Sequence, residues 1–147
     1  MANSGFTIEH DGRYLRTAVP IPGSTPERVL ACFTDPSQLE SWWGGELDAE
    51  LVQGGRYVVR FAELGRAMVG RVLKYDPPSS LEFGWSWDAT GEDPARRVAL
   101  FIRHDETTTL TTVHGPYGDD ESERTAREEH RAGWDYFLPR LDLVLES

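Results

Sequence analysis

Apolar and polar residues alternate with a period of two through the middle of the chain, from residue 46 to residue 114. Such a period predicts half-buried β-strands. The interruptions are short and rich in glycine, proline and acidic residues, which suits an antiparallel meander, whereas a parallel sheet would need helices between its strands. Six strands are expected in this part of the chain, over residues 46–51, 56–62, 67–75, 81–87, 97–104 and 108–114.

A further strand and two short helices are predicted ahead of this meander. Residues 13–20 alternate in the same way and end at a proline. Ser24 and Glu27 fit the capping box of a first helix. Asp35 is suited to N-cap a second helix, which Gly44 would end.

The C-terminal part of the chain predicts a long amphipathic helix. Apolar residues recur at steps of three and four over residues 122–145, and acidic residues precede them. Pro139 lies inside this pattern, so a kink or local break is expected near residues 135–138. The predicted fold is α+β: a seven-stranded curved antiparallel sheet grips the long C-terminal helix, and residues 1–12 form an N-terminal tail ahead of one domain at 13–147.

Composition limits the classes of function. A chain of 147 residues suits one domain, and 25 acidic against 15 basic residues give a net charge of −10, which disfavours nucleic acid and anionic membranes. No apolar run approaches the roughly 20 residues that span a bilayer, and no secretory signal begins the chain, so a cytoplasmic location without membrane insertion is expected. The single cysteine, Cys32, is expected to be a small buried hydrophobe.

Motifs spread over residues 13–145 resemble one known superfamily. They are Thr25-Pro26-Glu27-Arg28-Val29, Thr34-Asp35-Pro36, Trp42-Trp43-Gly44, Gly54-Gly55, Gly70-Arg71-Val72, Asp76-Pro77-Pro78, the threonine-rich stretch 108–114 and Gly133-Trp134. In order and spacing they resemble the START-like helix-grip (SRPBCC) superfamily, in the branch similar to the C-terminal domain of activator of Hsp90 ATPase. The resemblance implies this fold, on which lipid carriers, polyketide cyclases and many uncharacterised bacterial domains are built, so it does not fix an activity.

Alternation also predicts which side chains face the interior of the sheet. Leu81, Phe83, Trp85 and Trp87 share one face, and the same test turns Tyr57, Phe61 and His114 inward from their strands. On the helix, His130, Trp134 and Phe137 lie on the apolar stripe. The candidate ligand-binding residues are therefore Tyr57, Phe61, Trp85, Trp87, His114, His130, Trp134 and Phe137.

Two interpretations of this interior stay open. The aromatic rings either line a cavity or mesh as solid core. Gly70 and Gly133 favour a cavity, because each removes a side chain from the inward face. Trp42 and Trp43 either gate the mouth of a cavity or fill the core. The two histidines either orient a ligand or make structural hydrogen bonds.

The sequence thus predicts a module that binds a small hydrophobic or aromatic molecule, as a monomer or homodimer, without metal or cofactor. Glu128-Glu129-His130 lacks the second histidine of a zinc motif, and Gly54-Gly55 leads into a strand, unlike a phosphate-binding loop. A cyclase or aromatase that uses His114 or His130 to move a proton is the first alternative. The second is an Hsp90-related protein-interaction module, which would have an exposed apolar patch and no pocket.

Overall fold

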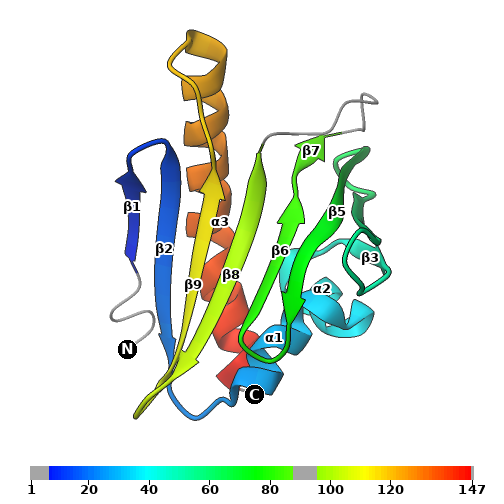
Figure 1. The fold of residues 1–147 in the computed structure, drawn as a ribbon, viewed down its shortest axis with the longest axis vertical. Helices are drawn as coiled ribbons and strands as arrows, with labels where there is room; N and C mark the ends of the chain where they lie inside the picture. The colour runs from blue at the N-terminus through cyan, green and yellow to red at the C-terminus, as the bar shows by residue number, and fades with distance from the viewer. Residues whose placement is uncertain (1–6, 88–95, 147) are drawn as a thin grey trace.

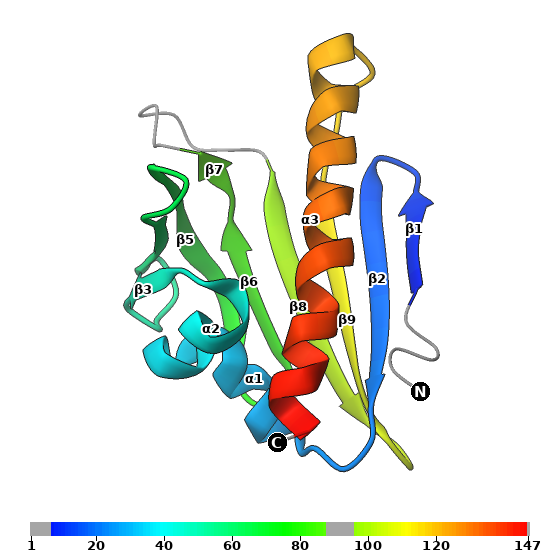
Figure 2. The ribbon, with the colours of Figure 1, turned by 180° about the vertical axis from the view of Figure 1, so that it is seen from behind.

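One curved antiparallel sheet lies against a long helix in the computed structural model, which describes residues 7–87 and 96–146. Figures 1 and 2 show the helix α3 (Glu121–Glu146) along one face of the sheet, with α1 (Pro26–Thr34) and α2 (Pro36–Trp43) beside its C-terminal half. The predicted α+β architecture is confirmed. The nine strands are β1 (Thr7–Asp11), β2 (Tyr14–Ile21), β3 (Glu46–Ala49), β4 (Arg56–Phe61), β5 (Arg66–Asp76), β6 (Ser80–Gly84), β7 (Ser86–Trp87), β8 (Arg97–His104) and β9 (Thr108–Gly115).

Neighbouring strands follow the order β1-β2-β9-β8-β6-β5-β4-β3, and β7 pairs with β5 off this path. Every pairing is antiparallel, as the short turns predicted. The predicted strand 81–87 is divided at Trp85. On one side of the break Gly84 pairs with Arg97, and the backbone N–H of Trp85 donates to the backbone carbonyl of Arg96 at 2.9 Å. Beyond it, Ser86 and Trp87 continue the pairing that β6 makes with β5, while the described pairing with β8 ends at Gly84.

A strand not expected from the sequence adds to one edge. Thr7–Asp11 lies in the stretch that the sequence analysis expected to be a tail, yet it forms β1 and pairs with β2 along its whole length. Gly12, with φ of 61°, provides the tight turn between the two strands. The strand is mostly exposed, so it has little of the apolar signal by which strands are recognised.

The caps of the two short helices agree with prediction at one helix and differ at the other. The Asp35 carboxylate accepts from the N–H groups of Ser37 and Gln38, and Gly44 ends α2 with φ of 78°, both as predicted. At α1 the N-cap is Thr25, whose hydroxyl accepts from Arg28 N–H, and not Ser24. The Ser24 hydroxyl instead faces the carbonyl of Leu145 at 3.5 Å, beside the end of α3.

The break expected in the last helix is absent, because α3 is helical without interruption from residue 121 to residue 146 and includes Pro139. Proline removes the N–H that would bond to the carbonyl four residues earlier, at Asp135. Asp135 is exposed, so water can replace that donor. Within the described residues, no helix is both long enough and apolar enough to cross a membrane.

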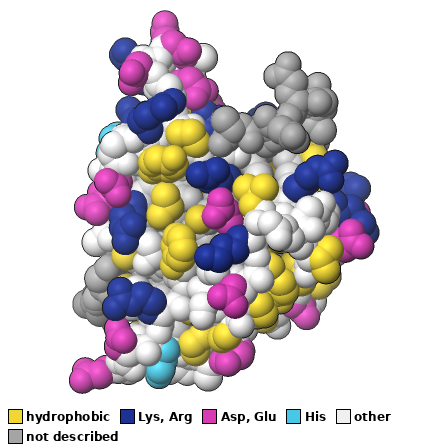
Figure 3. Space-filling model, viewed as in Figure 1, with side chains coloured by type: hydrophobic (Ala, Val, Ile, Leu, Met, Phe, Trp, Pro, Cys, Tyr) yellow, Lys and Arg dark blue, Asp and Glu magenta, His cyan; other side chains and the backbone are white. Residues whose placement is uncertain are grey.

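The core lies between the sheet and the helices. The strand alternation predicted its inward face correctly: the inward members of β4, β5, β6, β8 and β9 are buried, and Trp134, Leu138, Leu141 and Leu145 of α3 cover them. Cys32 is buried as expected, and burial raises the pKa of its thiol to about 11. Figure 3 shows the opposite face of the sheet, where apolar side chains are interspersed with charges of both signs.

Candidate ligand-binding site

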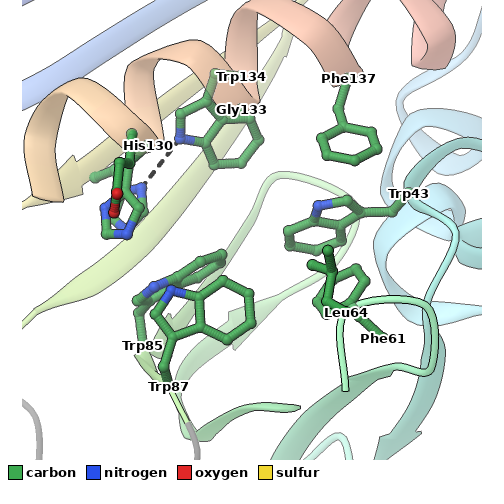
Figure 4. A pocket seen from close by; sticks show the side chains of 11 residues that line it. Trp43, Phe61, Leu64, Trp85, Trp87, His130, Gly133, Trp134 and Phe137 are labelled. Carbon is green, nitrogen blue, oxygen red and sulfur yellow. Dashed lines mark hydrogen bonds between the residues drawn. The ribbon is translucent and has the colours of Figure 1, made fainter. Parts of the chain in front are cut away.

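A cavity of about 120 Å³ separates the sheet from the middle of α3, and we call it the aromatic pocket. Figure 4 shows indole and phenyl rings on several sides of it, with His130 at one end and Phe137 at the other. Its lining consists of Trp43, Phe61, Leu64, Trp85, Trp87, His114, Glu129, His130, Gly133, Trp134 and Phe137.

The helix side of the aromatic pocket is a single stripe of α3. His130, Gly133, Trp134 and Phe137 follow at steps of three, one and three residues, and so face the same direction. Gly133 lies in the middle of this stripe. A Cβ atom placed there would meet no atom within 4 Å, so the missing side chain leaves open space.

The opposite walls come from four other parts of the fold. Phe61 ends β4, Trp85 and Trp87 lie at the break between β6 and β7, and His114 lies near the end of β9. Trp43 is the last residue of α2 and contacts the rings of Trp85 and Trp134, with ring centroids 6.0 and 6.1 Å away. The aromatic pocket therefore exists only when the sheet and the helices are assembled.

His114 is held in one defined state by a neighbouring indole. The Nε1–H of Trp134 donates to Nδ1 of His114 at 3.0 Å, and an indole nitrogen can only donate. His114 is 1% exposed, and this burial, together with the nearby His130 and Arg96, holds its pKa well below the usual 6.5. The imidazole is therefore neutral at pH 7 and carries its proton on Nε2.

His130 stacks on His114, with centroids 4.6 Å apart and an angle of 8° between the rings. Its Nδ1 shares a hydrogen bond of 2.7 Å with the hydroxyl of Tyr117, which is buried. Burial lowers the pKa of His130 to about 4, and the positive charges of Arg96 and Arg66 act in the same direction. Both imidazoles are thus uncharged at neutral pH.

A charged pair supports this end of the site from behind. The guanidinium of Arg96 lies 4.5 Å from the centre of the Tyr117 ring and donates from Nη2 to Oε1 of Glu123. That hydrogen bond, together with one from the backbone of Gly118, lowers the pKa of Glu123. The pair fixes Tyr117, and through it the orientation of His130.

Seven of the eight predicted ligand-binding residues line the aromatic pocket: Phe61, Trp85, Trp87, His114, His130, Trp134 and Phe137. Tyr57 does not. Its ring stacks on Phe83 at 4.1 Å and its hydroxyl donates to the carbonyl of Phe33, so it is a core residue that joins β4 to α1.

The two glycines that favoured a cavity have different roles. Gly133 opens the aromatic pocket, whereas Gly70 lies against the backbone of Gly84, where a Cβ atom would collide with the carbonyl oxygen. Gly70 thus permits close approach of two strands near the break at Trp85 and leaves no space.

Sequence reasoning missed three lining or supporting residues, Leu64, Glu129 and Tyr117, and left the role of Trp43 open. Trp43 was considered as a gate and lines the site, while Trp42 fills the core and donates from Nε1 to the carbonyl of Cys32 at 2.8 Å. Leu64 and Glu129 lie at the exposed rim, and Tyr117 follows β9 in a loop. Loop residues have no periodicity to reveal their direction, so only Glu129, which lies on α3 one turn before Gly133, was accessible to pattern analysis.

The site offers apolar surface and neutral nitrogen donors and acceptors. Among residues 7–87 and 96–146, no three His, Cys, Asp or Glu side chains are grouped so that they could hold a metal ion. The chemistry available to the side chains is burial and stacking of rings, hydrogen bonding, and proton transfer through an imidazole.

Comparison with solved structures places this fold among known proteins. DynU16, a protein in the dynemicin biosynthetic locus, is 29% identical with a TM-score of 0.76; the match covers 93% of this chain, which spans only 48% of DynU16. Ms6760 from Mycobacterium smegmatis is 20% identical, with a TM-score of 0.75 over 96% of this chain and 98% of that protein. The Aha1 dimer from Colwellia psychrerythraea is 18% identical, with a TM-score of 0.73 over 90% and 96% of the two chains.

None of the curated proteins matches the chain significantly. The model of the family described as "Activator of Hsp90 ATPase homolog 1-like protein" matches residues 24–146, which is most of the chain. The expected START-like helix-grip fold, of the type similar to the C-terminal domain of activator of Hsp90 ATPase, is confirmed by this match together with the structural neighbours. The chain therefore belongs to the family of Activator of Hsp90 ATPase homolog 1-like proteins.

Proposed function

We propose that this protein binds a small hydrophobic molecule with an aromatic ring in the aromatic pocket. The observation that carries the proposal is the cavity of about 120 Å³ between rings that would otherwise mesh as core. In another protein an apolar cavity of about 150 Å³ binds benzene, so a space of this order suits one ring. Leu64 and Glu129 are exposed at the rim, which gives larger substituents a way out to solvent.

The lining supports an aromatic ligand in particular. Tryptophan and phenylalanine side chains provide flat apolar surfaces, and pairs of rings attract each other beyond the burial of area. Trp43, Trp85, Trp87 and Trp134 all contribute to the walls. A ligand that enters would exchange its contacts with water for contacts with the indole faces. Small-molecule sites in proteins are usually lined by apolar and aromatic side chains of this kind.

Filling the aromatic pocket tests the proposal. Gly133→Leu places a side chain into the open space while improving the helix propensity of α3. Native mass spectrometry of protein purified from its source should find a bound small molecule above the 16.6 kDa chain, and the variant should lack it. Ala132→Leu, on the exposed side of the same turn, is the matched control and should keep the ligand. A ligand retained equally by Gly133→Leu would contradict binding at this site.

A cyclase-type enzyme is the second candidate, and the geometry of His130 supports it. When Nδ1–H donates to the Tyr117 oxygen, Nε2 has the free lone pair that a general base needs, and the low pKa keeps it free at neutral pH. Once the ligand is known, His130→Ala should abolish its turnover and leave its affinity within a few fold. Turnover that persists in this variant would favour carriage without catalysis.

The Hsp90-related interaction module receives less support, because it predicted a fold without a pocket. The oligomeric state, monomer or homodimer, and the cytoplasmic location expected from the sequence stay predictions. The description of the Colwellia psychrerythraea neighbour as a dimer is compatible with a dimer here. Sedimentation equilibrium of the purified protein decides between one and two copies of the 16.6 kDa chain.

A further inference from the structure

Two buried N–H groups, in side chains that line the aromatic pocket, have no hydrogen-bond partner among the described residues. They are Nε1 of Trp85 and Nε2 of His114, in side chains that are 7% and 1% exposed. A buried donor without a partner costs free energy, and native proteins rarely leave one unless a ligand, ion or water completes it. Two such donors in residues that line one cavity therefore indicate which chemical group a ligand should bring to it.

The missing group must be an acceptor. The Trp85 indole nitrogen can only donate. His114 Nδ1 already accepts from Trp134, so in the neutral ring the proton lies on Nε2 and this nitrogen donates as well. A group that only donates would satisfy neither atom. An oxygen with two lone pairs would satisfy both, and a carbonyl oxygen, unlike a hydroxyl, does so without adding a donor that needs an acceptor of its own.

The two rings that carry these donors are in contact. The ring centroids of Trp85 and His114 lie 4.7 Å apart at an angle of 60°. Hydrogen bonds from both rings to one atom would each span about 2.9 Å, and the contact between the rings places both side chains within reach of a common ligand. In Figure 4 the nitrogen-bearing edges of Trp85 and Trp87 lie on the side nearer to His130, which stacks on His114.

The charge at this end selects a neutral acceptor. Both imidazoles are uncharged, the guanidinium of Arg96 is paired with Glu123, and the carboxylate of Glu129 lies in the lining. A carboxylate ligand would leave water for a site whose nearby described cations are already engaged, Arg96 with Glu123 and Arg66 over the ring of Trp87, and it would meet Glu129 at the rim. A carbonyl oxygen accepts two hydrogen bonds and carries no net charge.

We infer that the aromatic pocket selects aromatic carbonyl compounds: the ring lies among the tryptophans, and the carbonyl oxygen accepts from Trp85 Nε1–H and His114 Nε2–H. This inference rests on the proposed function, because it names the ligand class of the same site. It requires that the two hydrogen bonds to the carbonyl oxygen favour binding more than the greater hydrophobicity of a hydrocarbon of the same shape does.

Acetophenone and ethylbenzene form a matched pair of probes, because they differ only in that the carbonyl group of acetophenone replaces a methylene group of ethylbenzene. Ethylbenzene is the more hydrophobic, so burial alone would favour it. Titration calorimetry on the wild-type protein should find acetophenone bound about tenfold more tightly, since it alone completes the two donors. Equal affinity, or tighter binding of ethylbenzene, would overturn the inference and leave the proposed function intact. Binding of neither probe would overturn both.

Trp85→Phe removes one donor and keeps a ring, and its lost N–H has no hydrogen bond within the protein to break. The preference for acetophenone should fall several fold in this variant. Trp87→Phe, in the same hairpin and also in the lining, should keep the preference. An equal effect in both variants would contradict a specific role for Trp85.

A spectroscopic measurement keeps the test independent of affinity. In a ¹H–¹⁵N spectrum the indole signal absent from Trp85→Phe assigns Trp85, and acetophenone should move that signal downfield while ethylbenzene does not. The ¹⁵N shifts of His114 should report the Nε2–H tautomer in the free protein. A signal from Trp85 that responds alike to both probes would count against the hydrogen bond.

Discussion

The stacked imidazoles of His114 and His130 make the stability of the protein depend on pH in a definite direction. Both have folded-state pKa values below the unfolded value of 6.5, so below that pH the unfolded chain binds more protons. Stability should fall as the pH falls from 7.5 to 5.5, by about 1.4 kcal/mol for each histidine that stays neutral and by about 3 kcal/mol for the pair.

Urea unfolding at the two pH values measures this loss. In His130→Phe about half of it should disappear, because only His114 then contributes. His10→Gln, which changes a histidine on the surface, should retain the full dependence. An unchanged dependence in His130→Phe would show that the ring is protonated as readily in the folded protein as in the unfolded chain.

Two glycines give opposite predictions for the same substitution. Gly133→Ala should stabilise the protein by about 0.5–1 kcal/mol, because the helix gains propensity and the new methyl group enters open space. Gly70→Ala should destabilise it by about 2 kcal/mol or more, because its methyl group would meet the backbone of Gly84. Thermal or urea unfolding of both variants tests the pair, and equal effects would contradict the assigned environments.

At single positions the sequence predicts which way a side chain points better than it predicts which residues the side chain contacts. Alternation correctly turned Trp85 and His114 inward, because a strand has only two faces. It turned Tyr57 inward as well, but a period of two does not say whether an inward ring reaches a cavity or packs on Phe83. The partner of His130 was out of reach, since Tyr117 lies in a loop and approaches it across thirteen residues.

Between elements, the hydroxyl of Tyr57 connects β4 to the end of α1 through the carbonyl of Phe33. Tyr57→Phe should lower the free energy of unfolding by about 1–2 kcal/mol, because a buried carbonyl loses its donor. Binding of acetophenone should not change, because Tyr57 is outside the aromatic pocket. Tyr136→Phe, at an exposed position on α3, is the control and should have little effect on stability. Weaker acetophenone binding in Tyr57→Phe would contradict its placement as core.

The elements that the sequence missed or misplaced share one property: their state depends on neighbours in space. β1 is exposed and is held by pairing with β2. The strand 81–87 divides at Trp85, where the described pairing with β8 ends, whereas the pairing with β5 continues from β6 into β7. Pro139 remains inside α3, whose buried side chains hold it against the sheet on both sides of that residue. Periodicity reports local preference, so such outcomes require the assembled fold.

At the scale of the whole molecule, ligand binding should stabilise every element together. The lining of the aromatic pocket comes from α2, β4, β7, β9 and α3, so unfolding of any of these elements destroys the site. At one hundred times its dissociation constant a ligand adds about 2.7 kcal/mol to the free energy of unfolding, or roughly 5–10 °C in the midpoint of a chain of this size. Calorimetry with acetophenone should find a single shifted transition, and Gly133→Leu should show no shift. A shift of equal size in Gly133→Leu would place the ligand elsewhere.

The overall architecture was the most predictable level, because many weak signals agree on it. Five short turns, one long amphipathic stripe and two capped helices leave few ways to cover one face of a sheet. The volume of the cavity was the least predictable, because it depends on rotamers of rings such as Trp43 and Phe61, whose centroids are 5.8 Å apart.

The distribution of tryptophan has a practical consequence for optical work. The chain has five tryptophans; four line the aromatic pocket, and the fifth, Trp42, is stacked on Trp43 with centroids 5.0 Å apart. Tryptophan emission therefore arises at the site or in contact with it, and the near-ultraviolet dichroism of the stacked pair should change when a ligand binds. The protein reports occupancy without a dye, a label or an engineered chromophore.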